Sequence, residues 1–193
     1  MNLQVITAIF WRDFRAFFTN PAGYVFISFF VAAAAVANFA WDGAFFANNL
    51  ADLSLLTRAM PWFLIVFIPL ITMGLWADEK RQGTDILLLT LPARDMDIVL
   101  GKYLAGLGIY SAALLFTLTN VAMLLYLGSP DLGLTFSTYV GYWLAGAALL
   151  AISMVASQLT ASMVLAFILG AVFNAGIIFI PAIAQFFAML AGA

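Results

Sequence analysis

Long runs of apolar residues alternate with short polar segments along the whole chain. An α-helix needs about 20 consecutive, mostly apolar residues to cross a bilayer, and five runs approach or reach that length. We therefore predict an all-α polytopic membrane protein that forms one transmembrane domain over residues 1–193. The predicted spans cover residues 22–41, 61–77, 103–127, 139–157 and 163–180.

The composition agrees with this pattern. Hydrophobic residues make up 66% of the chain and charged residues 8%, and the mean hydropathy is +1.11. A soluble domain carries about 25% charged residues, so this class is excluded. The net charge is −2 and the basic residues lie beside the spans, so we expect no nucleic-acid partner.

Residues 3–19 show a different pattern, in which apolar residues recur at helical spacing and charged residues lie between them. Ile6 and Ile9 fall on one face, and Arg12 and Arg15 follow. This pattern predicts an amphipathic helix in the membrane interface. Two alternatives are a water-exposed start of the first span and a cleavable signal peptide. The aromatic residues and an internal aspartate disfavour the signal peptide.

More than half of the charged residues lie in one segment, residues 78–102. Because cytoplasmic loops carry an excess of Lys and Arg, the basic residues assign its side. With a cytoplasmic N-terminus, the inner segments hold Arg12, Arg15, Lys80, Arg81, Arg94 and Lys102, and the outer loops hold Arg58 alone. We therefore place the N-terminus and the segment 78–102 in the cytoplasm. Five spans then put residues 181–193 outside, as a re-entrant or surface segment.

A short apolar helix is predicted inside this cytoplasmic segment. Gly83, Thr84 and Asp85 interrupt the charged run, five of the six residues 86–91 are apolar, and Pro92 ends the helix. Such a helix is too apolar for a solvated loop and too short to cross a bilayer. We expect it to be a docking surface for a soluble partner.

Three prolines set expected features of the spans. Pro61 is predicted to open the second span, because the first position of a helix does not need its N–H. Pro69 lies within the same span and should kink it. Pro181 is predicted to stop the fifth span.

Small and polar residues inside the spans favour helix packing over ligand binding. Gly101, Ala105 and Gly108 recur at helical spacing in the third span, which allows close approach of neighbouring helices. The polar residues of the spans are expected to form helix–helix hydrogen bonds; they are Ser28, Asn38, Ser111, Thr117, Thr119, Asn120, Ser153 and Asn174.

Several kinds of chemistry have no residues to support them. The chain contains no His and no Cys, and no predicted span has an ionisable residue near its middle, where ion-coupled carriers keep one. No G-x-x-x-x-G-K-[ST] motif occurs, so the chain has no P-loop for ATP. Asp78 and Glu79 could act as an acid–base pair, but a solvated, self-neutralising charge run fits them better. Transport without ion coupling would have to draw its energy from a partner.

Two motifs carry a resemblance to a known family. Asn20, Pro21 and Tyr24 form N-P-x-x-Y before the first span, and L-W-A-D-E-K-R-Q-G-T-D-I-L-L-L-T-L-P follows the second span. With V-L-G-K opening the third span, this order resembles the ABC-2 type transporter permeases, most closely the gliding-motility-associated branch. The resemblance covers about residues 5–180.

The resemblance implies six spans per subunit, a second permease subunit and a separate cytoplasmic ATPase dimer in a bacterial inner membrane. ATP and Mg would bind to the ATPase, and this chain would bind no cofactor. The leader would form an elbow helix anchored by Trp11, Arg12 and Arg15. The loop after the second span would hold a coupling helix, with its ATPase contact formed by Glu79, Gly83, Thr84, Asp85, Leu88 and Pro92. The turn at residues 158–162 would give a second contact.

This chain departs from the family pattern in two places. Asp85 stands where the family usually has Glu, so a salt bridge there would be weaker or absent. The chain also ends before the family's sixth span, as expected either of a truncated sequence or of a five-span form.

Three functions are conceivable for such a chain. The resemblance favours the membrane-spanning permease of an ATP-driven exporter, and the apolar spans favour a hydrophobic or lipid-linked cargo. The alternative is a non-transporting anchor or mechanotransmission subunit that works with such an ATPase. An intramembrane enzyme would need polar residues clustered at one depth, and we do not expect it.

Overall fold

The computed structural model describes residues 2–40, 54–85, 93–128 and 130–190. These residues form helices and contain no strand. Within the described ranges, five helical stretches are long and apolar enough to cross a membrane, as the sequence predicted. They are Pro21–Phe39, Ser54–Gln82, Asp95–Leu127, Leu132–Gln158 and Met163–Pro181.

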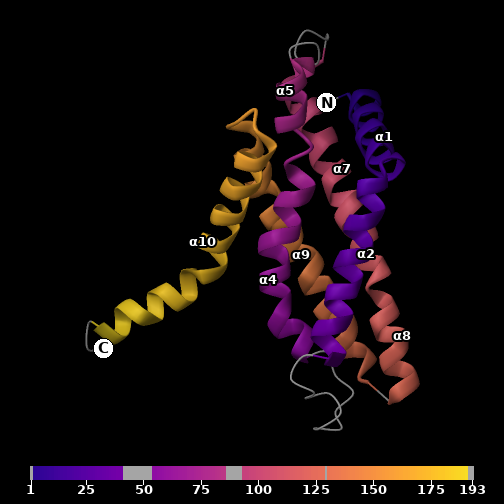
Figure 1. The fold of residues 1–193 in the computed structure, drawn as a ribbon, viewed down its shortest axis with the longest axis vertical. Coiled ribbons are helices and arrows are strands. Elements are labelled where there is room, and N and C mark those ends of the chain that lie inside the picture. The colour runs from indigo at the N-terminus through magenta and orange to yellow at the C-terminus, as the bar shows by residue number, and fades with distance from the viewer. Residues whose placement is uncertain (1, 41–53, 86–92, 129, 191–193) are drawn as a thin grey trace.

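Figure 1 shows the helices as an elongated bundle from which one helix diverges. In chain order they are α1 (Leu3–Thr19), α2 (Pro21–Ala35), the π-helix η1 (Val36–Ala40), α4 (Ser54–Thr72), α5 (Ala77–Gln82), α7 (Asp95–Phe116), α8 (Leu118–Leu127), α9 (Leu132–Gln158) and α10 (Met163–Leu190).

The N-P pair of the sequence motif separates α1 from α2. Asn20 has extended backbone angles (φ −87°, ψ 126°), ends α1 and caps α2, where its side-chain oxygen accepts a hydrogen bond from the Ala22 N–H at 3.0 Å. Pro21 then occupies the first turn of α2, where a missing N–H costs nothing. The motif is therefore a helix cap that turns the chain from α1 into the first span.

The second span begins earlier than predicted. α4 starts at Ser54 and contains Pro61 in its interior, so the prediction that Pro61 opens the helix is wrong. Leu56 and Met60 are buried in the core on the N-terminal side of this proline. Packing of the turn before Pro61 thus stabilises a helix that the proline alone would weaken.

The last helix also continues past a predicted stop. α10 runs to Leu190 with Pro181 inside it, so the prediction that Pro181 ends the helix is wrong. A proline inside a membrane helix kinks it and need not break it. Figure 1 shows α10 bending in its C-terminal half, away from the rest of the bundle. The predicted outer position of residues 181–193 stays a prediction.

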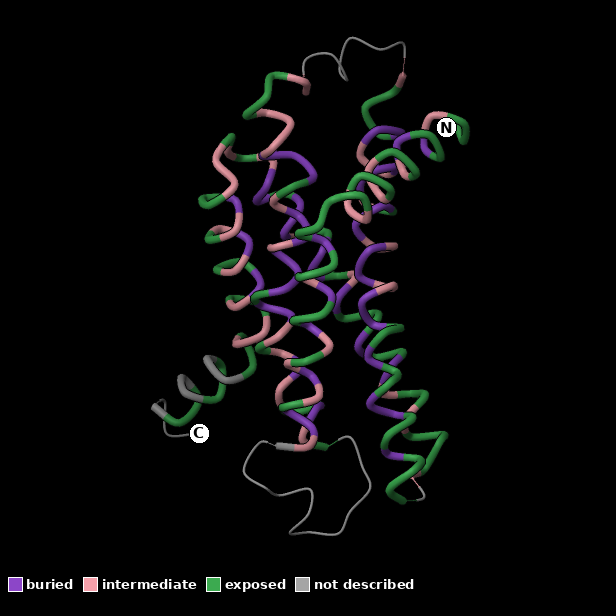
Figure 2. Tube along the Cα trace, turned by 45° about the vertical axis from the view of Figure 1, so that its right-hand side comes forward, coloured by how far each residue is buried: buried purple, intermediate pink, exposed green. Residues whose placement is uncertain are grey.

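The core lies where α4, α7 and α9 meet, with α10 packed on α4 and α9, and α1 packed on α7. Figure 2 shows buried positions turned inward along these helices and exposed positions turned outward. Gly101 packs against Ile6 and Ile9, and Gly108 against phenylalanine side chains of α1. The prediction that these glycines favour close packing is confirmed.

One end of the bundle gathers the charged segments. Figure 1 shows α1, α5, the start of α7 and the turn between α9 and α10 at this end, and the N-terminus of α4 and α8 at the opposite end. We call the first of these the charged end of the bundle.

Candidate functional site

Three helices bring four charged side chains together at the charged end. They are Arg12 and Asp13 of α1, Glu79 of α5 and Lys102 of α7. Arg12 pairs with Asp13 at 2.7 Å and with Glu79 at 2.6 Å. Lys102 pairs with Glu79 at 2.7 Å and with Asp13 at 3.4 Å. We call this group the four-charge cluster; it joins the helix before the first span to the segments on both sides of the central loop.

Lys102 is the centre of the cluster. Its side chain is 1% exposed, and its Nζ also donates a hydrogen bond to the Leu75 carbonyl at 2.5 Å and lies 4.8 Å from the centre of the Trp76 ring. A buried cation is tolerated only when it is paired and hydrogen-bonded. Lys102 meets this condition with two carboxylates, one carbonyl and one aromatic face.

Asp97, five residues before Lys102 on α7, connects α7 to the N-terminal end of α1. It is 1% exposed, and its Oδ2 accepts a hydrogen bond from the Asn2 N–H at 3.0 Å. Its Oδ1 has no hydrogen-bond partner among the described residues. The N-terminus of α1 is therefore held against the first turn of α7.

The opposite side of α5 contacts the end of α9. The Lys80 Nζ donates a hydrogen bond to the Gln158 carbonyl, and the Ala77 N–H donates to the Ser157 Oγ at 3.2 Å. Gln158 begins the turn for which the resemblance implied a second partner contact. α5 is thus bonded to α1 and α7 through Glu79, and to α9 through Lys80.

The residues assigned to the partner contact do not all lie on one surface. Glu79 is 17% exposed and points toward Arg12 and Lys102, inside the protein. Gly83 ends α5 with φ +70°, and the Thr84 hydroxyl bonds back to the Glu79 carbonyl at 3.3 Å. Asp85 forms no ion pair with a described residue. Leu88, Pro92 and the predicted helix 86–91 lie outside the described residues.

The three predicted anchors of α1 fall into two groups. Trp11 is 46% exposed, and the Arg15 guanidinium lies 5.2 Å from the centre of its ring. Arg12 belongs to the four-charge cluster instead. Sequence reasoning counted Lys102 and Arg12 as charges that flank the membrane, and no local spacing indicated that they would share Glu79.

The polar residues of the spans behave in two ways. Ser153 accepts a hydrogen bond from the Thr72 hydroxyl at 3.1 Å, and Thr117 exchanges hydrogen bonds with Tyr139, so the predicted helix–helix bonds form at these positions. Asn38 and Asn174 are fully buried, yet neither side-chain amide atom of either residue has a hydrogen-bond partner among the described residues. The prediction of helix–helix bonds is wrong for these two asparagines, and also for Thr119, whose hydroxyl donates instead to the Phe116 carbonyl three residues earlier at 2.9 Å. No group of three His, Cys, Asp or Glu that could hold a metal occurs within the described ranges.

No curated protein and no solved structure matches the chain. The sequence pattern of a family described as ABC-2 family transporter protein matches residues 26–191, which is most of the chain. This match and the five membrane-spanning helices indicate a multi-pass membrane protein. The family match further indicates a permease, a component of membrane transport and not a catalytic enzyme. The chain belongs to the ABC-2 family of transporter proteins.

Proposed function

We propose that this protein is the permease subunit of an ATP-driven exporter in a bacterial inner membrane, and that it works with a second permease subunit and a cytoplasmic ATPase. The ATPase would bind ATP and Mg, because this chain has no P-loop. The central motif further supports the gliding-motility-associated branch. The observation that carries the proposal is the four-charge cluster. It links α5, which leads into the predicted coupling loop, to α1 and to α7, which follows that loop.

The bonds of α5 suggest how force would enter the membrane domain. The predicted coupling helix follows α5 after three residues, so an ATPase that displaces residues 83–92 would pull on α5. Glu79 would pass this displacement to α1 and α7, and Lys80 would pass it to the end of α9. Because removing one partner of a buried ion pair costs about 3–5 kcal/mol, Glu79 and the buried Lys102 should move as one unit.

In this proposal the six interface residues have two roles. Gly83, Thr84, Asp85, Leu88 and Pro92 would contact the ATPase. Glu79 is paired with Arg12 and Lys102 and is only 17% exposed, so it would transmit the motion without touching the partner. The positive φ of Gly83 supports this division, because the chain changes direction there, between the bonded helix and the proposed contact.

The test is a change at the centre of the predicted coupling helix. Leu88→Asp places a charge on its apolar surface, and it should abolish co-purification of an ATPase with the tagged permease from native membranes. Membrane insertion should be unchanged, because the residue lies outside the spans. Leu134→Asp, at an exposed position at the opposite end of the bundle, is the matched control and should retain the ATPase.

Retention of the ATPase by Leu88→Asp would contradict docking at this helix. ATP-dependent movement of a labelled hydrophobic cargo into vesicles by the purified complex would support export. An ATPase-bound complex that moves none would favour mechanotransmission.

A further inference from the structure

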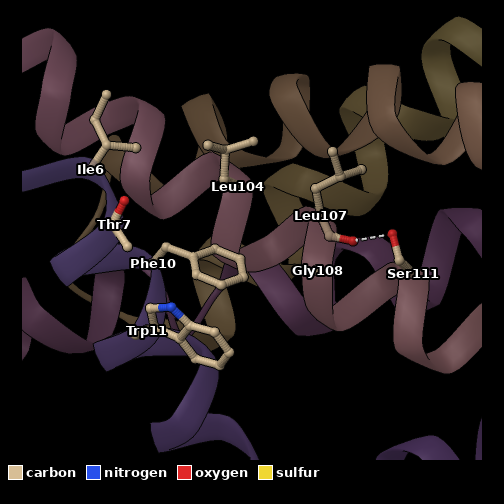
Figure 3. Close-up of a pocket in the computed structure, with 8 residues that line it drawn as sticks. All are labelled: Ile6, Thr7, Phe10, Trp11, Leu104, Leu107, Gly108 and Ser111. Carbon is tan, nitrogen blue, oxygen red and sulfur yellow. Dashed lines mark hydrogen bonds between the residues drawn. The ribbon is translucent and has the colours of Figure 1, made fainter. Parts of the chain in front are cut away.

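A groove of about 430 Å³ lies between α1 and α7, outside the four-charge cluster. Thr7, Phe10 and Trp11 line it from α1, and Leu104, Leu107 and Ser111 line it from α7 (Figure 3). Its walls are mainly aliphatic and aromatic. The groove therefore suits an apolar occupant with few hydrogen-bonding groups.

Two glycines of α7 set how closely α1 packs on α7 beside the groove. At Gly101 the helices touch, since a Cβ there would lie 2.8 Å from the Ile9 Cβ and 3.1 Å from the Ile6 carbonyl. At Gly108 no side chain projects from α7, and the rings of Phe10 and Phe14 approach it instead. The two helices are thus packed closely at both glycines, and the groove lies beside this contact, next to Leu104, which is 39% exposed.

A cation without a carboxylate partner among the described residues lies beside Trp11, one of the residues that line the groove. The Arg15 guanidinium is 5.2 Å from the centre of the Trp11 ring, and Trp11 is a wall of the groove. Arg15 has no carboxylate partner among the described residues, whereas Arg12 is neutralised by Asp13 and Glu79. An anion that binds beside the groove would therefore meet Arg15.

The position of the groove limits what can fill it. Arg15 comes shortly before Pro21, where the first span begins, and Leu104 and Ser111 belong to the helix of the third span. The groove thus lies against the helix of the third span, and we infer that it opens toward the bilayer near the start of the first span. Basic sites between membrane helices bind anionic lipid headgroups, while the apolar surface beside them accepts acyl chains.

We propose that the groove between α1 and α7 holds an acyl chain of an anionic phospholipid, and that the lipid phosphate pairs with Arg15. Such a lipid matches both properties of the site. Its acyl chain is apolar like Leu104 and Trp11, and its phosphate carries the negative charge that would pair with Arg15. This site does not depend on the ATPase contact, so it stands or falls separately from the proposed export function.

Native mass spectrometry of the purified protein in mild detergent tests the proposal. Phosphatidylglycerol and phosphatidylcholine are added at equal concentration in separate samples. The fraction of protein that retains one bound lipid should be several-fold higher with phosphatidylglycerol than with phosphatidylcholine. Arg15→Gln should lower this retention roughly fivefold, as expected for one basic residue at an anionic headgroup, and leave phosphatidylcholine unchanged. Arg58→Gln, an exposed arginine on α4, should behave as the wild type.

Filling the groove gives a second, independent measurement. Leu104→Trp should reduce retention of both lipids, and Thr7→Trp, which fills the groove from the exposed side of α1, should do the same if the first variant misfolds. Leu134→Trp adds the same ring outside the groove and should change nothing. Equal retention of the two lipids by the wild type would overturn the proposal. So would unchanged retention in folded groove variants, or competition by glycerol phosphate without acyl chains.

Discussion

Lys102 of α7 and Glu79 of α5 form a 2.7 Å ion pair in which the lysine side chain is 1% exposed. The two residues lie on opposite sides of the central loop, and Asp13 of α1 completes the contact from a third helix. A buried charge of this kind depends on every partner, because each loss leaves another charge unpaired. The pair therefore makes the geometry of the charged end sensitive to single substitutions.

Lys102→Met should destabilise the protein strongly. Removing the lysine leaves Glu79 and Asp13 close together with only the half-exposed Arg12 to neutralise them, a loss expected to cost about 3–5 kcal/mol. The measurement is thermal unfolding in detergent. Arg94→Met, at an exposed position before the same helix, is the control and should change little. The double variant Lys102→Met/Glu79→Gln should recover part of the loss, and no recovery would argue against the pair.

Arg12→Gln should have a much smaller effect on stability. The Arg12 side chain is 46% exposed, and ion pairs that reach solvent contribute about 0–1 kcal/mol. Its effect should also decrease at high salt, whereas the effect of Lys102→Met should not. Unfolding of both variants at low and high ionic strength separates the two cases. A loss for Arg12→Gln as large as that for Lys102→Met would show that Arg12 is the centre of the cluster.

Gly146→Ala should destabilise the contact between α9 and α7. A Cβ at this position would lie 2.3 Å from the ring of Tyr110, whose hydroxyl donates a 2.7 Å hydrogen bond to the Tyr142 carbonyl. Overpacking of this size costs about 1–3 kcal/mol. Gly141→Ala is the matched control on the same helix, since nothing lies within 4 Å of its added Cβ. Equal unfolding temperatures of the two variants would contradict this packing.

Gly83→Val should loosen the end of α5 without affecting the spans. Gly83 has φ +70°, a left-handed conformation that costs other residues about 1–2 kcal/mol. Amide hydrogen exchange in residues 77–82 should become faster, and exchange in α9 should stay unchanged. Gly83→Asn should be milder, because asparagine tolerates this conformation at helix ends. The reverse order of the two variants would indicate that the backbone angle is not what limits this position.

The sequence was informative where one local property decides the structure. The length and apolarity of the runs predicted five spans, and the glycines at 101 and 108 predicted close packing of the third span. Prolines 61 and 181 misled the prediction, because packing of the turn before Pro61 and the tolerance of membrane helices for proline outweigh the local preference.

The candidate site was harder to predict, because its residues come from distant parts of the chain. The segment containing Glu79 stood out by its charge, but Asp13 and Lys102 are separated by 89 positions, and no periodicity connects them. Their proximity depends on how α1 packs on α7. Gly101 permits α1 to pack closely on α7, but its presence in the sequence does not indicate which side chains this packing brings together.

Asn20 has a consequence for the mechanics of the protein. Asn20 is both the C-cap of α1 and the N-cap of α2. The connection between α1, which carries Arg12 and Asp13, and the first membrane span is therefore a single residue long. Because the connection is so short, a rotation of α1 should rotate α2 with it. Since α2 packs on α4, the rotation would also reach α4.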